Sequence, residues 1–439
     1  MHRYRFSSMR GRLGHLIQKL KDVGFYHVFL TSVLVKFVGM AGNILLARVM
    51  SKTDYGTYSY ILNAYSILIL LGDMGTNVTN VQMGSECAHD PQKQDAWFVW
   101  LFRQGMRIIL ASCVILFFSP LFYPFKSREL GLYTASLFLL PLLENVNRFI
   151  LSNARSKLKD QVYARINLFS SLIHWFFLLP LSYLFSFRGA IYSSYAVQMS
   201  IMLFGLYQSR RFLPRRATTA CLSSTAKRVA LKLSFSSGLS NIINNSLGLV
   251  DVFFLGFVIQ DMSVIASYKV AANIPNALAF IPSAIDTVLL PRFARMQGDA
   301  RRLRSSYGKV IAAVCGVNLL VCIGVFLFGG SVMTLLYGAQ YEDATVCFFI
   351  LIVGYFFSCV RSVSYSVLYS QRKVGVNLAV VAISAVLTVS LNMLLIPRYG
   401  SVGAACASAV TNFFAAAVML GYLLHFFVSR IRDMENERA

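Results

Sequence analysis

The stretch LNMLLIPRYGSVGAACASAVTNF, residues 391–413, joins two long apolar segments, 375–396 and 402–428. Pro397 ends the first segment and Gly403-Ala404 opens the second, and proline and glycine are the residues that most often interrupt helices. A helix needs about 20 mostly apolar residues to cross a bilayer, and both segments are long enough. The stretch therefore predicts two membrane-spanning helices joined by a short turn.

The same kind of segment recurs along the whole chain. Of the 439 residues, 56% are apolar and 13% are charged, which is too apolar for a soluble domain and excludes a soluble enzyme and a nucleic-acid-binding domain. We expect an all-α polytopic membrane protein with twelve transmembrane helices, at 26–47, 57–80, 104–124, 131–152, 165–186, 189–208, 235–258, 265–290, 310–330, 344–368, 375–396 and 402–428.

The basic residues set the predicted orientation. Lys and Arg number 41 against 18 Asp and Glu. With a cytoplasmic N-terminus, the inner segments hold 32 basic residues when Arg107, Arg148 and Arg165, at the inner ends of their spans, are counted with them; the outer loops hold six, and three lie deeper in the spans, as the positive-inside rule requires. Both termini are thus expected in the cytoplasm, with residues 1–25 as an amphipathic lead-in. The eight Cys and six His show no disulfide or metal-ligand spacing, so no metal and no cofactor is expected.

The chain reads as two weakly similar halves. The most basic segment, 209–234, separates an N-lobe at 26–208 from a C-lobe at 235–428, which is followed by a cytoplasmic tail at 429–439. Gly189-Ala190 opens the sixth span as Gly403-Ala404 opens the twelfth. Each half has an even number of spans, so the two six-helix lobes share one orientation and are expected to enclose a central cavity, a layout found in transporters.

Ionisable residues inside the spans mark functional candidates, because a charge near the bilayer centre is costly. Several lie in polar stripes of helical period on the first two spans of each half, which favours one wet cavity. The candidate cavity residues are Lys36, Asn43, Asp73, Asn77, Asn244, Asp251, Lys269, Asn273, Asn276, Asp286, Arg361 and Tyr365. The alternative is interhelical hydrogen bonding, and for Glu144 a local pair with Arg148. Pro275 and Pro282 are candidate hinges.

Three stretches resemble one family: LLARVMSKTDYGTYSYILNAYSILILLGDMGTN (45–77), ASYKVAANIPNALAFIPSAIDTVLLPRFARM (266–296) and the opening stretch at 391–413. They are similar to the Asp-Tyr-Gly-x-Tyr entry, the eighth helix and the last hairpin of polysaccharide-transport flippases. The chain is identified as a member of the O-antigen flippase (Wzx-like) type within the multidrug/oligosaccharidyl-lipid/polysaccharide (MOP) exporter superfamily. The resemblance implies a MATE-like fold, alternating access, and transfer of an undecaprenyl-pyrophosphate-linked oligosaccharide across the cytoplasmic (inner) membrane for surface polysaccharide synthesis, such as that of lipopolysaccharide.

The chemistry of the candidates suits that substrate. Lys and Arg in a wet cavity can replace the hydration of a pyrophosphate, and the carboxylates can balance the cations or couple transport to protons or another cation. The expected partners are the lipid-linked oligosaccharide, membrane lipids and the polysaccharide polymerase and chain-length machinery, with no nucleic acid. The alternatives are a multidrug or cation antiporter of the same superfamily, a peptidoglycan-precursor flippase, which typically has two further spans, and a membrane glycan polymerase or ligase, which the short outer loops disfavour.

Overall fold

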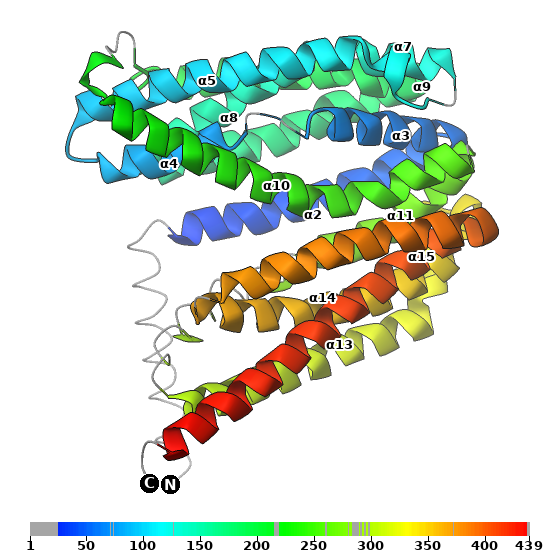
Figure 1. Cartoon of the computed structure of the whole chain (residues 1–439). Helices are drawn as coiled ribbons and strands as arrows, with labels where there is room; N and C mark the ends of the chain where they lie inside the picture. The colour runs from blue at the N-terminus through cyan, green and yellow to red at the C-terminus, as the bar shows by residue number, and fades with distance from the viewer. Residues whose placement is uncertain are drawn as a thin grey trace, which may run out of the picture. The chain divides into compact units, whose positions relative to one another are not determined.

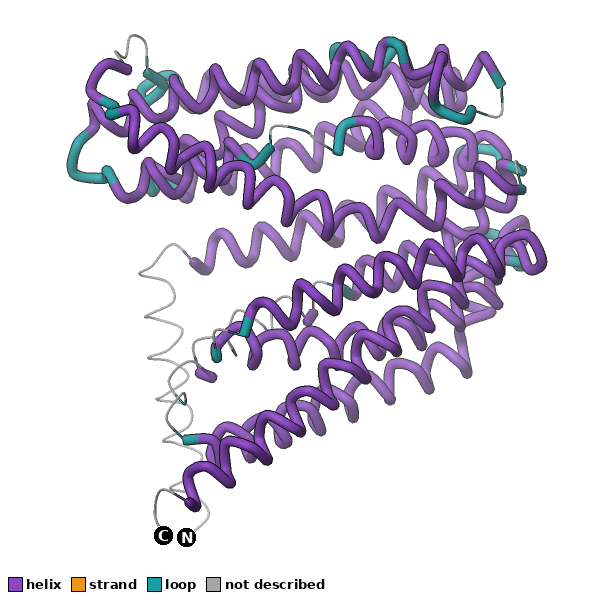
Figure 2. The backbone as a smooth tube through the Cα atoms, in the orientation of Figure 1, coloured by secondary structure: helices purple, strands orange, loops and turns teal. Residues whose placement is uncertain are grey.

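A computed structural model describes residues 25–436 except 71, 73, 126, 215–218, 260, 280, 283–288, 290–291, 294–295, 297–298 and 372. The described residues form helices and no strand (Figure 2). The helices labelled in Figure 1 are α2 Phe25–Val49, α3 Lys52–Leu68, α4 Thr76–Glu86, α5 Pro91–Phe117, α7 Arg128–Ala135, α8 Leu140–Ser156, α9 Asp160–Ser209, α10 Ser224–Val258, α11 Met262–Leu278, α13 Ala300–Tyr337, α14 Ala344–Ser370 and α15 Val374–Asn436. Short turns of helix lie at α6 Ser119–Phe122, η1 Thr219–Cys221 and η2 Ala339–Tyr341.

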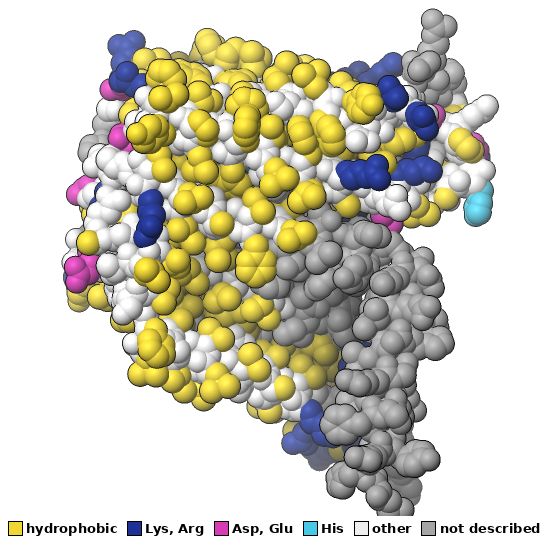
Figure 3. All heavy atoms as spheres, turned by 180° about the vertical axis from the view of Figure 1, so that it is seen from behind, with side chains coloured by type: hydrophobic (Ala, Val, Ile, Leu, Met, Phe, Trp, Pro, Cys, Tyr) yellow, Lys and Arg dark blue, Asp and Glu magenta, His cyan; other side chains and the backbone are white. Residues whose placement is uncertain are grey.

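Five of these helices are long and apolar enough to cross a membrane within the described part of the chain: Pro91–Phe117, Asp160–Ser209, Ala300–Tyr337, Ala344–Ser370 and Gly375–Arg432. Two of the five, α9 and α15, each contain two predicted spans. Figure 3 shows hydrophobic side chains over most of the face drawn, with charged side chains gathered toward its ends. This is the surface expected of a helical protein whose solvent is lipid.

Each of the two double-length helices contains a bend at matching places in the two halves. The backbone leaves the helical region at Ser186 (φ 52°, ψ −140°) in α9 and at Gly400 (φ 60°, ψ −133°) in α15. Three residues later, a Cβ added to Gly189 would lie 2.0 Å from the carbonyl oxygen of Leu181, and one added to Gly403 would lie 2.4 Å from that of Leu395. Only glycine permits this approach of backbone to backbone. The structure thus confirms the predicted turns and their repetition.

The predicted second span, 57–80, is not one continuous helix. The helix α3 ends at Leu68 and α4 begins at Thr76. Gly72, Met74 and Gly75 between them have positive φ angles of 42°, 47° and 76°, which end an α-helix because every residue of a right-handed α-helix has a negative φ. The expectation that the polar residues of this span form one helical stripe is therefore wrong, since the break changes the register of the two helices.

The described chain folds into two compact units. Unit 1 comprises the described residues up to Gly42 together with Leu68–Ser119 and Ala135–Ile242. It contains most of α2 and α10 with α4, α5, α8 and α9, and one of its cores packs Trp97, Leu101 and Phe149 together. In this core the ring of Phe102 meets that of Phe149 edge to face at 5.3 Å, a favoured geometry of aromatic pairs.

Unit 2 comprises Asn43–Ile67, Pro120–Thr134 and the described residues from Ile243 onward. Its core runs along α13, α14 and α15 and includes Tyr307, Val363 and Phe427. The hydroxyl of Tyr307 also shares a 2.8 Å hydrogen bond with that of Ser364. The core therefore fixes the face that α14 turns toward the rest of this unit.

Residues from the first half of the sequence belong to unit 2 through specific polar contacts. The Lys52 ammonium lies 2.7 Å from the carboxylate of Asp343, and the Asn63 amide donates to the Leu249 carbonyl at 3.2 Å. Arg48 donates to the carbonyls of Leu335 and Leu336 near the end of α13, where a cation is favoured by the helix dipole. The two units are defined by contacts between residues, and their boundaries differ from those of the predicted lobes. The lobe boundaries stay a prediction. The expected lead-in at residues 1–25 lies, apart from its last residue, outside the described residues.

Candidate functional site

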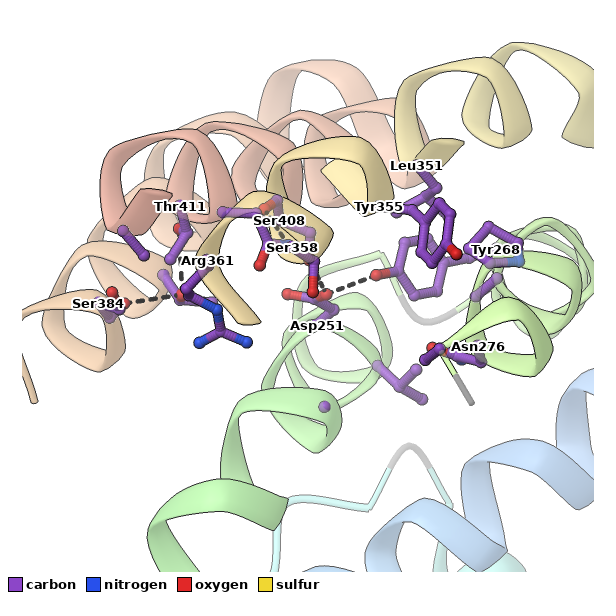
Figure 4. Close-up of a pocket in the computed structure, with 18 of the residues that line it drawn as sticks. Asp251, Tyr268, Asn276, Leu351, Tyr355, Ser358, Arg361, Ser384, Ser408 and Thr411 are labelled. Carbon is purple, nitrogen blue, oxygen red and sulfur yellow. Dashed lines mark hydrogen bonds between the residues drawn. The ribbon is translucent and has the colours of Figure 1, made fainter. Parts of the chain in front are cut away.

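A polar cavity of about 330 Å³ lies inside unit 2. It is walled by α10, α11, α14 and α15, and Figure 4 shows side chains from all four helices pointing into it. Its polar lining comprises Asp251, Tyr268, Lys269, Asn276, Tyr355, Ser358, Arg361, Ser384, Thr388, Ser408, Thr411 and Asn412. A concave site into which polar and charged groups converge is a candidate ligand-binding pocket.

Asp251 on α10 is the most enclosed charged group of this cavity, with 4% of its surface exposed. The hydroxyl of Tyr268 donates to Oδ2 at 2.5 Å, the hydroxyl of Ser408 donates to the same oxygen, and the amide of Asn392 donates to Oδ1 at 2.8 Å. A buried carboxylate is tolerated only when hydrogen bonds replace its lost hydration. Three donors from α11 and α15 do so here.

Two cations line the same cavity. Lys269 follows Tyr268 on α11, and Arg361 lies on α14. Among the described residues neither forms an ion pair within 4.0 Å. In Figure 4 the guanidinium of Arg361 points away from the α14 and α15 ribbons into the open part of the pocket. With one carboxylate and two cations, the described lining carries a formal excess of positive charge, which favours an anionic ligand.

The α15 wall consists of hydroxyls and amides. The Thr388 hydroxyl donates to the Ser384 carbonyl at 2.8 Å and shares a 3.1 Å hydrogen bond with the Thr411 hydroxyl. The Asn412 amide donates to the Ser408 carbonyl at 3.0 Å. These residues were not among the candidates from the sequence. Their spacing carried the signal, because Ser384, Thr388 and Asn392 recur every four residues and so share one helix face.

The cavity brings together part of the predicted set. Asp251, Lys269, Asn276 and Arg361 line it, and so does Pro275 inside α11. Elsewhere in unit 2, Asn43 is half-buried, Asn273 donates to the Tyr55 hydroxyl at 3.3 Å, Tyr365 packs against the core, and Pro282 is buried. Lys36, exposed on α2, and Asn77, half-buried on α4, belong to unit 1. Asn244 lies within the described backbone of α10, and Asp73 and Asp286 lie outside the described residues.

Other polar residues of the spans form hydrogen bonds between or within helices. The buried amide of Asn80 donates to the Ser152 hydroxyl at 2.9 Å, and the Ser66 hydroxyl donates to the carbonyl of Leu62 four residues earlier at 2.7 Å. Arg148 lies 3.4 Å from the carboxylate of Glu144 one turn before it. The prediction of a local pair for Glu144 is therefore confirmed.

The oxygen atoms around Asp251 also suit a small cation. The side-chain oxygen of Asn392 is buried and has no hydrogen-bond partner among the described residues, although the amide nitrogen of the same residue binds Asp251. Carboxylate, hydroxyl and amide oxygens are the ligands that hard cations prefer. The same carboxylate can instead carry a proton.

The sequence is similar to a protein family and to two membrane proteins. A family model described as "Polysaccharide biosynthesis protein" matches residues 45–346. An uncharacterized membrane protein of Methanocaldococcus jannaschii is 23% identical over 411 residues, covering 87% of this chain and 79% of that protein. A probable low-salt glycan biosynthesis flippase of Haloferax volcanii, Agl15, is 24% identical over 184 residues, which is 41% of this chain and 38% of the flippase.

Two solved structures have similar folds. An inward-facing multidrug resistance MATE family transporter of the MOP superfamily superposes with a TM-score of 0.74 at 14% identity, covering 90% of this chain and 95% of that one. The lipid II flippase MurJ in an inward closed conformation superposes with a TM-score of 0.72 at 15% identity, covering 91% and 89%. The predicted all-α MATE-like fold is confirmed. This chain is a multi-pass membrane protein with the fold of MOP-superfamily transporters and flippases, and it belongs to the polysaccharide biosynthesis protein family.

Proposed function

We propose that the protein is a flippase that moves an undecaprenyl-pyrophosphate-linked oligosaccharide across the cytoplasmic membrane for the synthesis of a surface polysaccharide such as O-antigen. The observation that carries the proposal is the composition of the unit 2 cavity in a member of this family: two cations against one carboxylate, among hydroxyls and amides. Arg361 would bind the pyrophosphate, because a guanidinium donates two parallel hydrogen bonds to phosphate oxygens. The side chains of Ser358, Ser384 and Asn412 would form hydrogen bonds with the sugar hydroxyls.

The buried carboxylate would supply the coupling. We place the coupling ion, a proton or an alkali cation, at Asp251, whose neighbours are the hydroxyls of Tyr268 and Ser408 and the amide of Asn392. The charged and titratable groups that line the cavity around it are Tyr268 and Lys269 on α11 and Tyr355 and Arg361 on α14. Loading the carboxylate would change the charge that Lys269 and Arg361 experience, and so the affinity for an anionic substrate. Both termini would lie in the cytoplasm, and the polymerase and chain-length machinery would take up the product outside.

A second candidate function is a multidrug or cation antiporter. The similarity to a MATE transporter and the buried Asp251 favour it. The charge of the described lining favours an anion instead, so we rank the antiporter second. The two functions predict opposite effects of removing Arg361, because an organic cation would bind better without it and a pyrophosphate would bind worse.

The test is complementation of a strain that lacks the native gene, with surface polysaccharide measured against the amount of membrane-inserted protein. Arg361→Ala is expected to reduce polysaccharide at least tenfold, and Arg361→Lys to reduce it less, because Lys retains the charge and loses the planar pair of donors. Arg304→Ala, which removes an exposed charge on α13, is the matched control and should leave polysaccharide unchanged. Lys36→Ala tests the predicted cavity residue of unit 1. Normal polysaccharide from Arg361→Ala at normal protein level would overturn the proposal.

A further inference from the structure

A second cavity, of about 440 Å³, is lined by residues of unit 1 and is open to the surface of that unit, at the end of α4 and α8 that the predicted topology assigns to the cytoplasmic side. Three helices wall it. From α4 come Asn77, Val78, Val81, Gln82 and Ser85, from α8 come Arg148, Leu151, Ser152 and Arg155, and from the start of α9 comes Tyr163. On both α4 and α8 successive lining positions are one or three residues apart, so each helix presents a single face to the cavity.

Buried hydrogen bonds hold these walls together. Asn80 of α4 donates to the Ser152 hydroxyl of α8 at 2.9 Å. The buried side-chain amide of Gln94, on α5, donates to the carbonyls of both Gly84 on α4 and Ser156 on α8, each at 2.9 Å. Bonds of this kind, in a bundle where lipid offers no substitute partner, fix the spacing of the helices. The cavity is therefore a built feature of the unit.

The cationic groups of this cavity are two arginines. The guanidinium carbon of Arg155 lies 5.0 Å from the centre of the Tyr163 ring, a cation–π contact that orients the group and leaves its N–H edge available. Among the described residues Arg155 forms no ion pair, and Arg148 pairs with Glu144 at 3.4 Å while 51% of its side chain stays exposed. Each guanidinium has five N–H donors, so one carboxylate contact leaves most of them for a ligand.

The rest of the lining is divided between apolar and neutral polar groups. Val78, Val81 and Leu151 supply an apolar wall, and Gln82 and Ser85 supply polar groups nearer the helix end of α4. Such a pocket matches a molecule whose anionic head is joined to a hydrocarbon chain. Arg148 and Arg155 are two helical turns apart, about 10 Å along α8, so a diphosphate that both side chains approach is better matched than a single phosphate.

We propose that this unit 1 pocket binds the phosphate headgroup of a phosphoryl lipid from the cytoplasmic leaflet. Two sources share this chemistry, a polyprenyl pyrophosphate and an anionic phospholipid. The proposal that Arg148 and Arg155 bind a phosphate does not depend on the proposed flippase function. The identification of the lipid as the transported polyprenyl pyrophosphate rests on that function. In that case the pocket is a loading site, distinct from the cavity around Asp251.

The test is lipid binding to the purified full-length protein by native mass spectrometry, with undecaprenyl pyrophosphate, phosphatidylglycerol and phosphatidylcholine as separate probes. The double variant Arg148→Ala, Arg155→Ala is expected to weaken binding of at least one anionic probe tenfold or more and to leave phosphatidylcholine unchanged. The matched control is the double variant Arg103→Ala, Arg107→Ala on α5, which removes two other exposed arginines from the same unit. Inorganic pyrophosphate should compete with the bound lipid more strongly than orthophosphate.

The outcomes separate the sources. Loss of undecaprenyl pyrophosphate alone identifies a loading site, loss of phosphatidylglycerol alone identifies a lipid site, and loss of both identifies a general phosphate site; each supports the proposal. Equal binding by the double variant and the wild type, or an equal loss in the α5 control, overturns it. If the double alanine variant does not fold, Arg155→Gln and Arg155→Lys replace it, with loss expected only for Gln. Normal polysaccharide from Arg361→Ala together with lost lipid binding here would refute the proposed function and leave this site standing.

Discussion

Asp251 has a well-defined structural environment as well as the coupling role that we propose for it. Its carboxylate is almost fully buried and accepts hydrogen bonds from Tyr268, Asn392 and Ser408. An uncompensated charge in such a place would cost several kcal/mol. The three donors make the carboxylate tolerable, and their removal would leave it without support. The proposed coupling role needs the charge of the carboxylate, whereas the structural role needs only its hydrogen bonds. Substitutions can therefore separate the two roles.

Replacing Asp251 by Asn and by Leu should therefore give different results. In Asp251→Asn the hydroxyls of Tyr268 and Ser408 can rotate to accept the new N–H groups, so the melting temperature should stay within a few degrees of the wild type. In Asp251→Leu the donors lose their partner, so the free energy of unfolding should fall by about 2–5 kcal/mol. Transport should drop in both variants and lose its dependence on pH or on the cation gradient. An Asn variant with unchanged ion dependence would remove Asp251 from the coupling role.

The hairpins within α9 and α15 show the same local solution at equivalent positions in the two halves. In both, a residue with positive φ, Ser186 or Gly400, precedes by three positions a glycine that touches the carbonyl eight residues before it. The halves differ at the proline, because Pro180 lies six residues before its bend and Pro397 lies three before. The turn itself, rather than the proline, is the repeated element.

Alanine at either hairpin glycine should destabilise the protein. Gly189→Ala and Gly403→Ala each place a methyl group against a backbone carbonyl that cannot rotate away, with an expected loss of about 1–3 kcal/mol. Gly421→Ala, also on α15, is the control, because a Cβ there meets no atom within 4 Å and alanine favours a helix interior. The measurement is thermal unfolding of the purified variants. Equal melting temperatures for Gly403→Ala and Gly421→Ala would contradict the packing argument.

Apolar length and the turn residues at 189 and 403 were enough to predict the helical class and both hairpins. The break between α3 and α4 was missed, because the apolar run up to Leu71 reads as a continuous helix although Gly72 and Gly75 allow it to end. In the cavity the charges Asp251, Lys269 and Arg361 were predictable from their cost in a membrane. The neutral groups of α15 were not singled out, because serine and threonine are also common in ordinary transmembrane helices.

The orientation of the whole chain is a separate prediction, because packing within a unit does not say which end faces the cytoplasm. Two exposed positions test it: Cys221, in the basic segment expected inside, and Glu342, in the short segment before α14 expected outside. One variant keeps Cys221 as its sole cysteine, and the other lacks all native cysteines and carries Glu342→Cys. In intact cells a membrane-impermeant maleimide should label only the Glu342→Cys variant, and after permeabilisation it should label both. Labelling of Cys221 alone in intact cells would reverse the topology and, with it, the cytoplasmic placement of the Arg148 and Arg155 pocket.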